Sequence, residues 1–215
     1  MVKASGKTKK QIYVFIDASN LFYGGEKSLG WKIDYKKLIK YLRKKYGVQR
    51  IFYYGGIEIY DFDYSVLDKK PLDLNKLINY LEKKLIESKL SQAQIVLLGR
   101  HIQRAKFYRK LKQFGYELKL KPVKIFTDDE GNTTKKANCD VDMTFDLMRL
   151  MGQYSEAVIL SGDGDFAIVL NYLKSKKRKI TILARGERTA KEIRQLAGSN
   201  FRDFTRLRTK LEFIK

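Results

Sequence analysis

Short strand-like runs alternate with amphipathic segments along most of the sequence, and this alternation limits the fold more than any other feature. Runs with β-branched, aromatic or alternating apolar residues lie at residues 12–16, 50–54, 94–98, 116–126, 157–160 and 180–184. Segments with helical spacing of apolar residues lie at residues 35–46, 74–88, 105–114, 140–151, 166–175 and 189–197. Alternating strands and helices build parallel sheets covered by helices. We therefore predict an α/β fold with a mostly parallel central sheet flanked by helices.

No internal repeat and no linker rich in Pro, Gly or Ser divides the chain, so we predict one domain over residues 11–215. The first ten residues, MVKASGKTKK, are basic and polar, and they predict a flexible tail at residues 1–10. Polar and turn-forming residues predict loops at 55–72 and 127–138. Pro122 cannot donate a backbone hydrogen bond, so it is expected to limit strand pairing in the 116–126 run.

The chain is strongly basic, with 45 lysines and arginines against 24 aspartates and glutamates and a formal net charge of +21. Folded domains with this excess of positive charge are typical of proteins that bind nucleic acid, because each basic side chain at a phosphate releases a condensed counterion. A lysine-rich, solvated surface is the alternative explanation. No apolar run approaches the about 18 residues of a membrane helix, so we expect no membrane contact and a cytoplasmic location.

The segment RAKFYRKLK at residues 104–112 is a basic helix that could contact a nucleic-acid backbone. Its candidate substrate-binding residues are Arg104, Lys106 and Arg109. A solvated helix face that binds nothing remains the alternative for these residues.

Aspartates directly follow two of the predicted buried strands. Asp17 ends the first run, and Asp163 and Asp165 follow the run at 157–160. Because the carboxyl ends of parallel strands share one edge of the sheet, these side chains are expected to lie together. Asp140 and Asp146 lie in the helical segment just before the second of these strands. Asp140 could instead cap that helix, and Asp146 could instead pair with a basic group.

Several carboxylates in one place repel one another, so they need a compensating cation unless they are protonated. Oxygen ligands without imidazoles or thiolates favour Mg²⁺ or Mn²⁺, which activates water and polarises phosphoryl oxygens. His101 is the one histidine, which excludes a two-histidine ribonuclease mechanism and a histidine-rich zinc site. The sequence also lacks a GxxxxGK[ST] loop, so P-loop ATP hydrolysis is not supported.

Three motifs carry a resemblance to a known family: FIDASNLFYG at residues 15–24, ANCDVDMTFDLM at 137–148, and AVILSGDGDFAIVLNYL at 157–173. In this order they resemble the NYN domain family, in the LabA-like branch of the PIN-like nuclease superfamily. The resemblance implies a single Rossmann-like (PIN-like) domain and metal-dependent cleavage of RNA. The positions that match the family's motifs are Asp17, Asn20, Asp140, Asp146, Ser161, Asp163 and Asp165. Asn138 and Cys139 stand where Gly-Val is common in the family, a departure that concerns packing more than chemistry.

From these matches we hypothesise that Asp17, Asp140 and Asp163 bind a metal ion. Asp165 would bind a second ion or orient the attacking water. Asp146 is a further candidate ligand, and Asn20 and Ser161 are candidates for contacts with a carboxylate or with the RNA phosphate.

Three other functions are alternatives to this hypothesis. A non-catalytic RNA-binding module with the same fold stays open, because some members of the family are thought to bind RNA without cutting it. Phosphotransferases of the haloacid dehalogenase type have a second aspartate two residues after the first, and Ser19 occupies that position here, which argues against this function. Toprim-type enzymes have a glutamate after the first strand, and Asp17 is found there instead. A homodimer is compatible with the resemblance.

Overall fold

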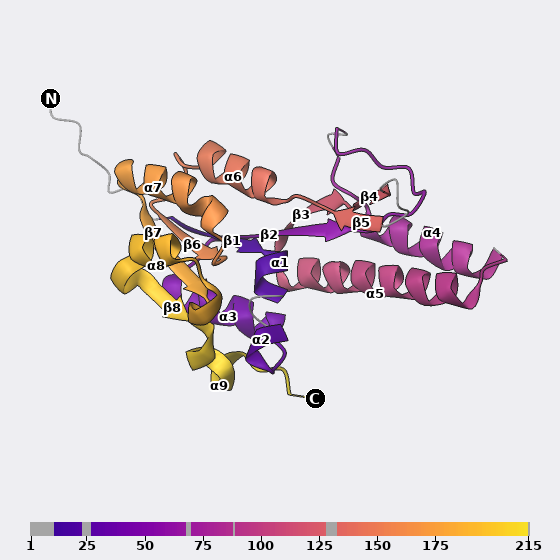
Figure 1. Ribbon diagram of the computed structural model, residues 1–215, viewed down its shortest axis with the longest axis horizontal. Coiled ribbons are helices and arrows are strands. Elements are labelled where there is room, and N and C mark those ends of the chain that lie inside the picture. The colour runs from indigo at the N-terminus through magenta and orange to yellow at the C-terminus, as the bar shows by residue number, and fades with distance from the viewer. Residues whose placement is uncertain (1–10, 23–26, 68–69, 88, 128–132, 215) are drawn as a thin grey trace, which may run out of the picture.

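Six strands form one parallel sheet in the order β3-β2-β1-β6-β7-β8 (Figure 1). The strands are β1 Ile12–Asp17, β2 Arg50–Ile57, β3 Glu117–Pro122, β6 Glu156–Leu160, β7 Lys179–Ala184 and β8 Phe201–Asp203. The computed structural model describes residues 11–22, 27–67, 70–87, 89–127 and 133–214, so the tail predicted at residues 1–10 lies outside the described residues. The prediction of an α/β fold with a parallel central sheet is confirmed.

The first strand, β1, lies in the middle of the sheet between β2 and β6. All of its residues are buried, which explains its unbroken apolar sequence. Asp17 pairs in register with Tyr54 of β2, and Ile16 pairs with Leu160 of β6. The last residue of β1 therefore lies level with Ser161, the first residue after β6.

Helices cover both faces of the sheet (Figure 1). On one face, Val14 and Ile16 belong to a hydrophobic cluster that includes residues of α3 (Tyr35–Tyr46) and α5 (Gln92–Phe114), and α4 (Leu74–Glu87) packs on α5. On the other face, Tyr13 and Phe15 pack with α6 (Asp140–Arg149), α7 (Ala167–Ser175) and α8 (Lys191–Ala197). Short helices α1 (Ala18–Asn20), α2 (Lys27–Leu29) and α9 (Arg208–Leu211) complete the chain. This alternation of side chains along β1 follows from the pleat of a strand.

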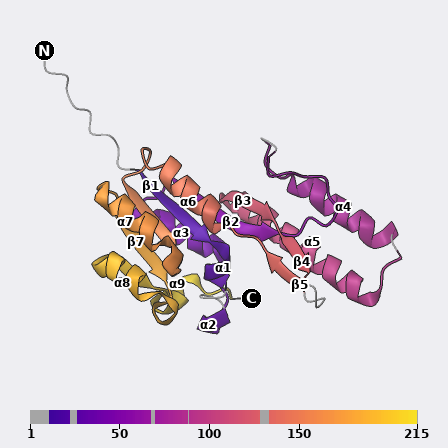
Figure 2. The same ribbon diagram turned by 45° about the horizontal axis from the view of Figure 1, so that its top comes forward.

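The strand predicted at residues 94–98 is wrong, because this run is the beginning of α5. Ser91 and Gln94 form a capping box, in which each side chain accepts a hydrogen bond from the backbone of the other, so the helix begins at Gln92. A short apolar run cannot be assigned to strand or helix by periodicity alone. Helices α4 and α5 form a helical hairpin that extends away from the sheet (Figure 1 and Figure 2).

The predicted strand at 116–126 and the predicted loop at 127–138 are both partly wrong. The chain leaves the main sheet at Pro122, whose register partner is Ile57 at the end of β2. It then forms β4 (Lys124–Thr127), which pairs antiparallel with β5 (Thr133–Lys136) in a separate two-stranded sheet. Pro122 has no N–H to donate, which is consistent with the end of the β3 pairing at this residue.

Two predicted helices begin later than expected. A 3₁₀ turn, Gly164–Phe166, precedes α7, which begins at Ala167 rather than at residue 166, and α8 begins at Lys191 rather than at residue 189.

Within the described part of the chain, no helix has both the length and the apolar composition that a bilayer crossing requires.

Candidate active site at the carboxyl edge of the sheet

Asp17 is the buried last residue of β1, and hydrogen bonds hold its carboxylate in place. Oδ1 accepts from the Ser19 N–H at 3.0 Å, from the Ser19 hydroxyl at 2.7 Å and from the Asn20 N–H at 3.2 Å. Oδ2 accepts from the Ser161 hydroxyl at 3.2 Å. Asp17 is therefore the N-cap of α1, and it also reaches the end of the neighbouring strand. A buried charged carboxylate needs such donors.

The turn after β6 carries the next two acidic residues. Ser161, besides donating to Asp17, accepts from the Asp163 N–H at 3.2 Å. Asp163 caps the following 3₁₀ turn, since its Oδ1 accepts from the Asp165 N–H at 3.1 Å. Ser161 thus links Asp17 to the turn that bears Asp163 and Asp165.

Asp140 is the first residue of α6, and its N–H donates to Asn138 Oδ1 at 3.1 Å. The pKa of Asp140 is raised to about 6, first by its partial burial and then by the charges of Asp17, Asp163 and Asp165. Three distant segments of the chain therefore bring four carboxylates within electrostatic reach of one another. We call Asp17, Asp140, Asp163 and Asp165 the acid cluster.

None of the four carboxylates of the acid cluster forms an ion pair with a lysine or arginine of the described residues. Its donor atoms are hard oxygens, which fit Mg²⁺ or Mn²⁺. In the same described segments, no three His, Cys, Asp or Glu side chains are already arranged to hold a metal ion. Sharing a cation would therefore require these side chains to rotate.

Asp146, also a candidate ligand, lies outside the acid cluster. It is six residues beyond Asp140 on α6, a distance of roughly 9 Å along the helix axis. Its carboxylate accepts from the Tyr54 hydroxyl at 3.0 Å and pairs with Arg149 at 2.5 Å and with Lys119 at 3.5 Å. These partners give the buried carboxylate a structural role between α6 and the sheet.

One acidic residue at this edge was not identified from the sequence. The Glu192 carboxylate, near the start of α8, lies against Gly164, between Asp163 and Asp165 in the sequence. Only the packing of α8 against this turn brings Glu192 here, so no local sequence motif indicated it.

A sequence profile of the NYN domain matches residues 11–65 and 59–205. The chain belongs to the NYN domain family. It is 25% identical over 206 residues to the low amplitude and bright protein LabA of Synechococcus elongatus, which covers 94% of this chain and 88% of LabA. A crystal structure of a Vibrio parahaemolyticus protein of unknown function has a similar fold, with a TM-score of 0.60 at 18% identity over 93% of this chain and 95% of that one. These likenesses fit a PIN-like fold.

The candidate substrate-binding residues of this NYN domain face different directions along α5. Lys106 pairs with Glu82 of α4 at 2.7 Å, and Arg109 donates to Asn75 of α4 at 3.2 Å. Arg104 points elsewhere, with its Nε 3.7 Å from Glu58. Lys106 and Arg109 therefore lie against α4, whereas Arg104 lines a cavity on another side of α5.

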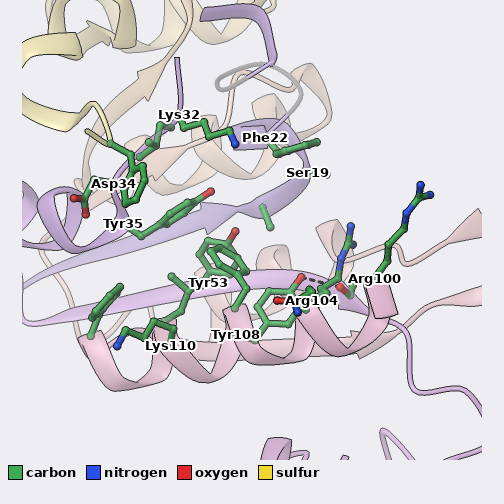
Figure 3. A pocket seen from close by; sticks show the side chains of 18 of the residues that line it. Ser19, Phe22, Lys32, Asp34, Tyr35, Tyr53, Arg100, Arg104, Tyr108 and Lys110 are labelled. Carbon is green, nitrogen blue, oxygen red and sulfur yellow. Dashed lines mark hydrogen bonds between the residues drawn. The ribbon is translucent and has the colours of Figure 1, made fainter. Parts of the chain in front are cut away.

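A cavity of about 980 Å³ lies between α5 and the segment that follows β1 (Figure 3). Its aromatic walls come from Phe22, Tyr35, Tyr53, Phe107, Tyr108, Phe114 and Phe213, and its basic residues are Lys32, Arg100, Arg104 and Lys110. Ala18 and Ser19, the residues after Asp17, also line it. No single segment of the sequence predicts this cavity, because its walls come from separate segments of the NYN domain.

Proposed function

We propose that this NYN domain protein is a metal-dependent ribonuclease that hydrolyses RNA phosphodiester bonds at the acid cluster. The convergence of four aspartates at the carboxyl edge of a parallel sheet supports the proposal. The surrounding chain has a net charge of +21, which suits a polyanionic substrate. Membership of a family of the PIN-like nuclease type is consistent with this chemistry.

Asp17, Asp140 and Asp163 are the proposed ligands of a first Mg²⁺ or Mn²⁺ ion. A bound divalent cation there would lower the pKa of water and offset the negative charge of the phosphate. Asp165 lies two residues beyond Asp163 in the same turn, and its side chain is exposed. We assign it to a second ion or to the orientation of the attacking water.

The other polar residues of the edge would act as positioning residues. The hydroxyls of Ser19 and Ser161 donate to opposite oxygens of Asp17, so they would fix the direction of its free lone pairs. Hydrolysis adds water across the P–O bond: its oxygen bonds to phosphorus, and the leaving oxygen takes up a proton. With a cation bound, the carboxylates of the acid cluster would keep its positive charge where negative charge develops on the phosphate.

Turnover of labelled RNA with Mg²⁺ or Mn²⁺ tests the proposal. Asp17→Asn and Asp163→Asn should each lower turnover on the order of 100-fold or more, because they remove charge at the cluster with little change in shape. RNA binding should persist, since basic residues elsewhere provide most of the affinity. Asp142→Asn is the matched control: Asp142 pairs with Lys121 at 2.8 Å and lies outside the cluster. Equal turnover in wild type and both cluster variants would refute the metal site.

A non-catalytic RNA-binding module is the second candidate, favoured by one observation. The described carboxylates of the cluster are not arranged to hold an ion as they stand. Wild-type protein that binds RNA but gives no product with either metal, while the same RNA is cut by a control nuclease, would decide for this alternative.

A further inference from the structure

The aromatic cavity begins directly beside the acid cluster. Ala18 and Ser19 follow Asp17 and form part of the cavity wall. Tyr108 of α5 also lines it, and its hydroxyl donates to the carbonyl of Gly56 at 2.7 Å. A group bound in the cavity would therefore lie next to a phosphate at the cluster.

Three phenylalanines from separate segments expose their rings at this cavity. Phe22, Phe107 and Phe213 are 41%, 37% and 50% exposed, although large apolar side chains are usually covered. Phe107 packs edge-to-face on Tyr35, with ring centroids 5.2 Å apart, so its ring is held in a defined orientation. Convergent exposed aromatic rings are typical of sites that bind planar rings by stacking.

Positive charge surrounds these rings. Lys32, Arg100 and Lys110 line the cavity and form no ion pair with any residue in the described segments. Figure 3 shows Arg100 and Arg104 together at one end of the cavity and Lys110 at the other. An apolar floor with a cationic rim suits a ligand that combines planar rings with phosphates.

Gly99 leaves part of the cavity wall open. It lies in the interior of α5 on the cavity wall, and a Cβ added there would have no protein atom within 4 Å. Glycine destabilises a helix interior relative to alanine. No described side chain fills the space beside Gly99, so this part of the cavity wall is open to a ligand.

We propose that the cavity receives an unstacked base of single-stranded RNA, from the nucleotide next to the scissile phosphate. The location of that phosphate rests on the proposed nuclease function, whereas base binding itself does not. The volume of about 980 Å³ lies at the upper end of ligand pockets, about 300–1,000 Å³, so it has room for more than one planar ring. The side-chain amide of Gln103 on the same wall offers a donor and an acceptor to a base edge.

Binding of a short single-stranded RNA that carries one 2-aminopurine, measured by fluorescence with EDTA present, tests the proposal without cleavage. Gly99→Trp should place a ring in the cavity, because its Cβ would meet nothing within 4 Å, and it should lower affinity about tenfold or more, with loss of the 2-aminopurine signal. Phe107→Ala should weaken binding to a similar degree. Phe145→Ala, on α6 at 63% exposure, is the matched control for Phe107→Ala and should change nothing.

Charge is tested separately by two lysines of the same helix. Lys110→Ala removes a cavity residue, whereas Lys112→Ala removes an exposed charge of α5 that does not line the cavity. Only the first should weaken binding of the single strand beyond the small loss expected from net charge. Duplex RNA of the same sequence keeps its bases stacked, so Gly99→Trp and Phe107→Ala should not change its affinity.

Unchanged single-strand binding in Gly99→Trp would overturn the proposal, and so would an equal loss of single-strand and duplex binding. Because a cavity variant could lose its fold, melting temperatures accompany each titration, and Gly99→Trp is expected to melt no lower than wild type. The nuclease proposal can fail independently: a wild type that binds the base but never cuts RNA refutes catalysis alone. Cleavage that persists in Gly99→Trp with unchanged affinity refutes the base site alone.

Discussion

The side-chain oxygen of Asn20 accepts a hydrogen bond from the Gly162 N–H at 2.9 Å, across 142 residues of sequence. This bond joins the turn after β1 to the turn after β6. It therefore holds the segments of Asp17 and Asp163 in register at the edge of the sheet. Asn20, expected from the sequence to contact a carboxylate or the RNA phosphate, uses its oxygen to position the backbone.

Loss of this bond should affect stability and turnover together. Asn20→Ala should lower the free energy of unfolding by about 1–3 kcal/mol, because it leaves the partly buried Gly162 N–H without its partner. Turnover should fall through kcat more than KM if the two turns lose their alignment. Urea unfolding and steady-state kinetics measure both effects. Asn75→Ala is the control, since Asn75 makes one exposed bond to Arg109; an equal effect of the two variants would contradict a positioning role.

Asp146 should behave differently from the cluster aspartates. Asp146→Asn weakens buried, charge-assisted contacts with Arg149 and Tyr54, so it should cost roughly 1–3 kcal/mol of stability. The folded variant should keep most of its turnover at low temperature. Chemical unfolding and RNA turnover test this. If Asp146→Asn lost as much turnover as Asp163→Asn and kept a normal melting temperature, Asp146 would be a metal ligand and not a structural residue.

Divalent cations should stabilise the protein through the acid cluster. A ligand that binds only the folded state at 100 times its Kd adds about 2.7 kcal/mol, so Mn²⁺ should raise the melting temperature clearly above that in EDTA. Asp17→Asn and Asp163→Asn should largely abolish the rise, whereas Asp142→Asn should retain it. An identical rise in all four proteins would place the ion elsewhere.

The raised pKa of Asp140 predicts a pH dependence in the metal-free protein. Its pKa is about 6 in the fold against an ordinary value of 3.8, so folding favours the protonated form. The associated stability is present below about pH 3.8 and is lost as the pH rises through about 6. Relative to Asp140→Asn, wild type should therefore lose stability between pH 4 and pH 7. Melting in EDTA across this range checks the sign; a constant difference between the two proteins would contradict it.

The two adjacent glycines of β2 should tolerate no side chain. A Cβ on Gly56 would lie 2.7 Å from the Ala137 Cβ and 3.1 Å from the Val123 side chain. Gly56→Ala should therefore displace the segment before Asp140 and cost about 1–3 kcal/mol of stability. Gly99→Ala, which meets nothing within 4 Å, should instead stabilise α5 slightly. Thermal melting compares them, and a neutral Gly56→Ala would contradict the close approach.

One rule was enough to predict from the sequence both the parallel sheet and the proximity of Asp17 and Asp163. Asp17 and Asp163 each stand close behind a buried apolar strand, and parallel strands end at a common edge. The grouping of Asp140 with them was less apparent, because it depends on where α6 begins. The contact of Asp146 with the Tyr54 hydroxyl could not be predicted from the motif, because Tyr54 lies on β2, 92 residues away in the sequence.

The rest depends on tertiary structure that periodicity does not encode. The run QIVLL at 94–98 has the composition of a strand, but the capping box of Ser91 and Gln94 makes it helical, and Ile95, Val96 and Leu97 remain exposed. The basic side chains of α5 could not be assigned to its faces before α4 was placed against it. The cavity needs five or more segments in contact, so no window of the sequence could contain it.

The central place of β1 has a consequence for synthesis. The ribosome makes β1 before the other strands of the sheet, yet one of its two neighbours is β6. The Ser161 hydroxyl, which donates a hydrogen bond to Asp17, follows Asp17 by 144 residues. Until residues 156–165 have left the exit tunnel, β1 has an open side and the four aspartates have no common location. A nascent chain therefore cannot assemble this edge before residue 165 has emerged.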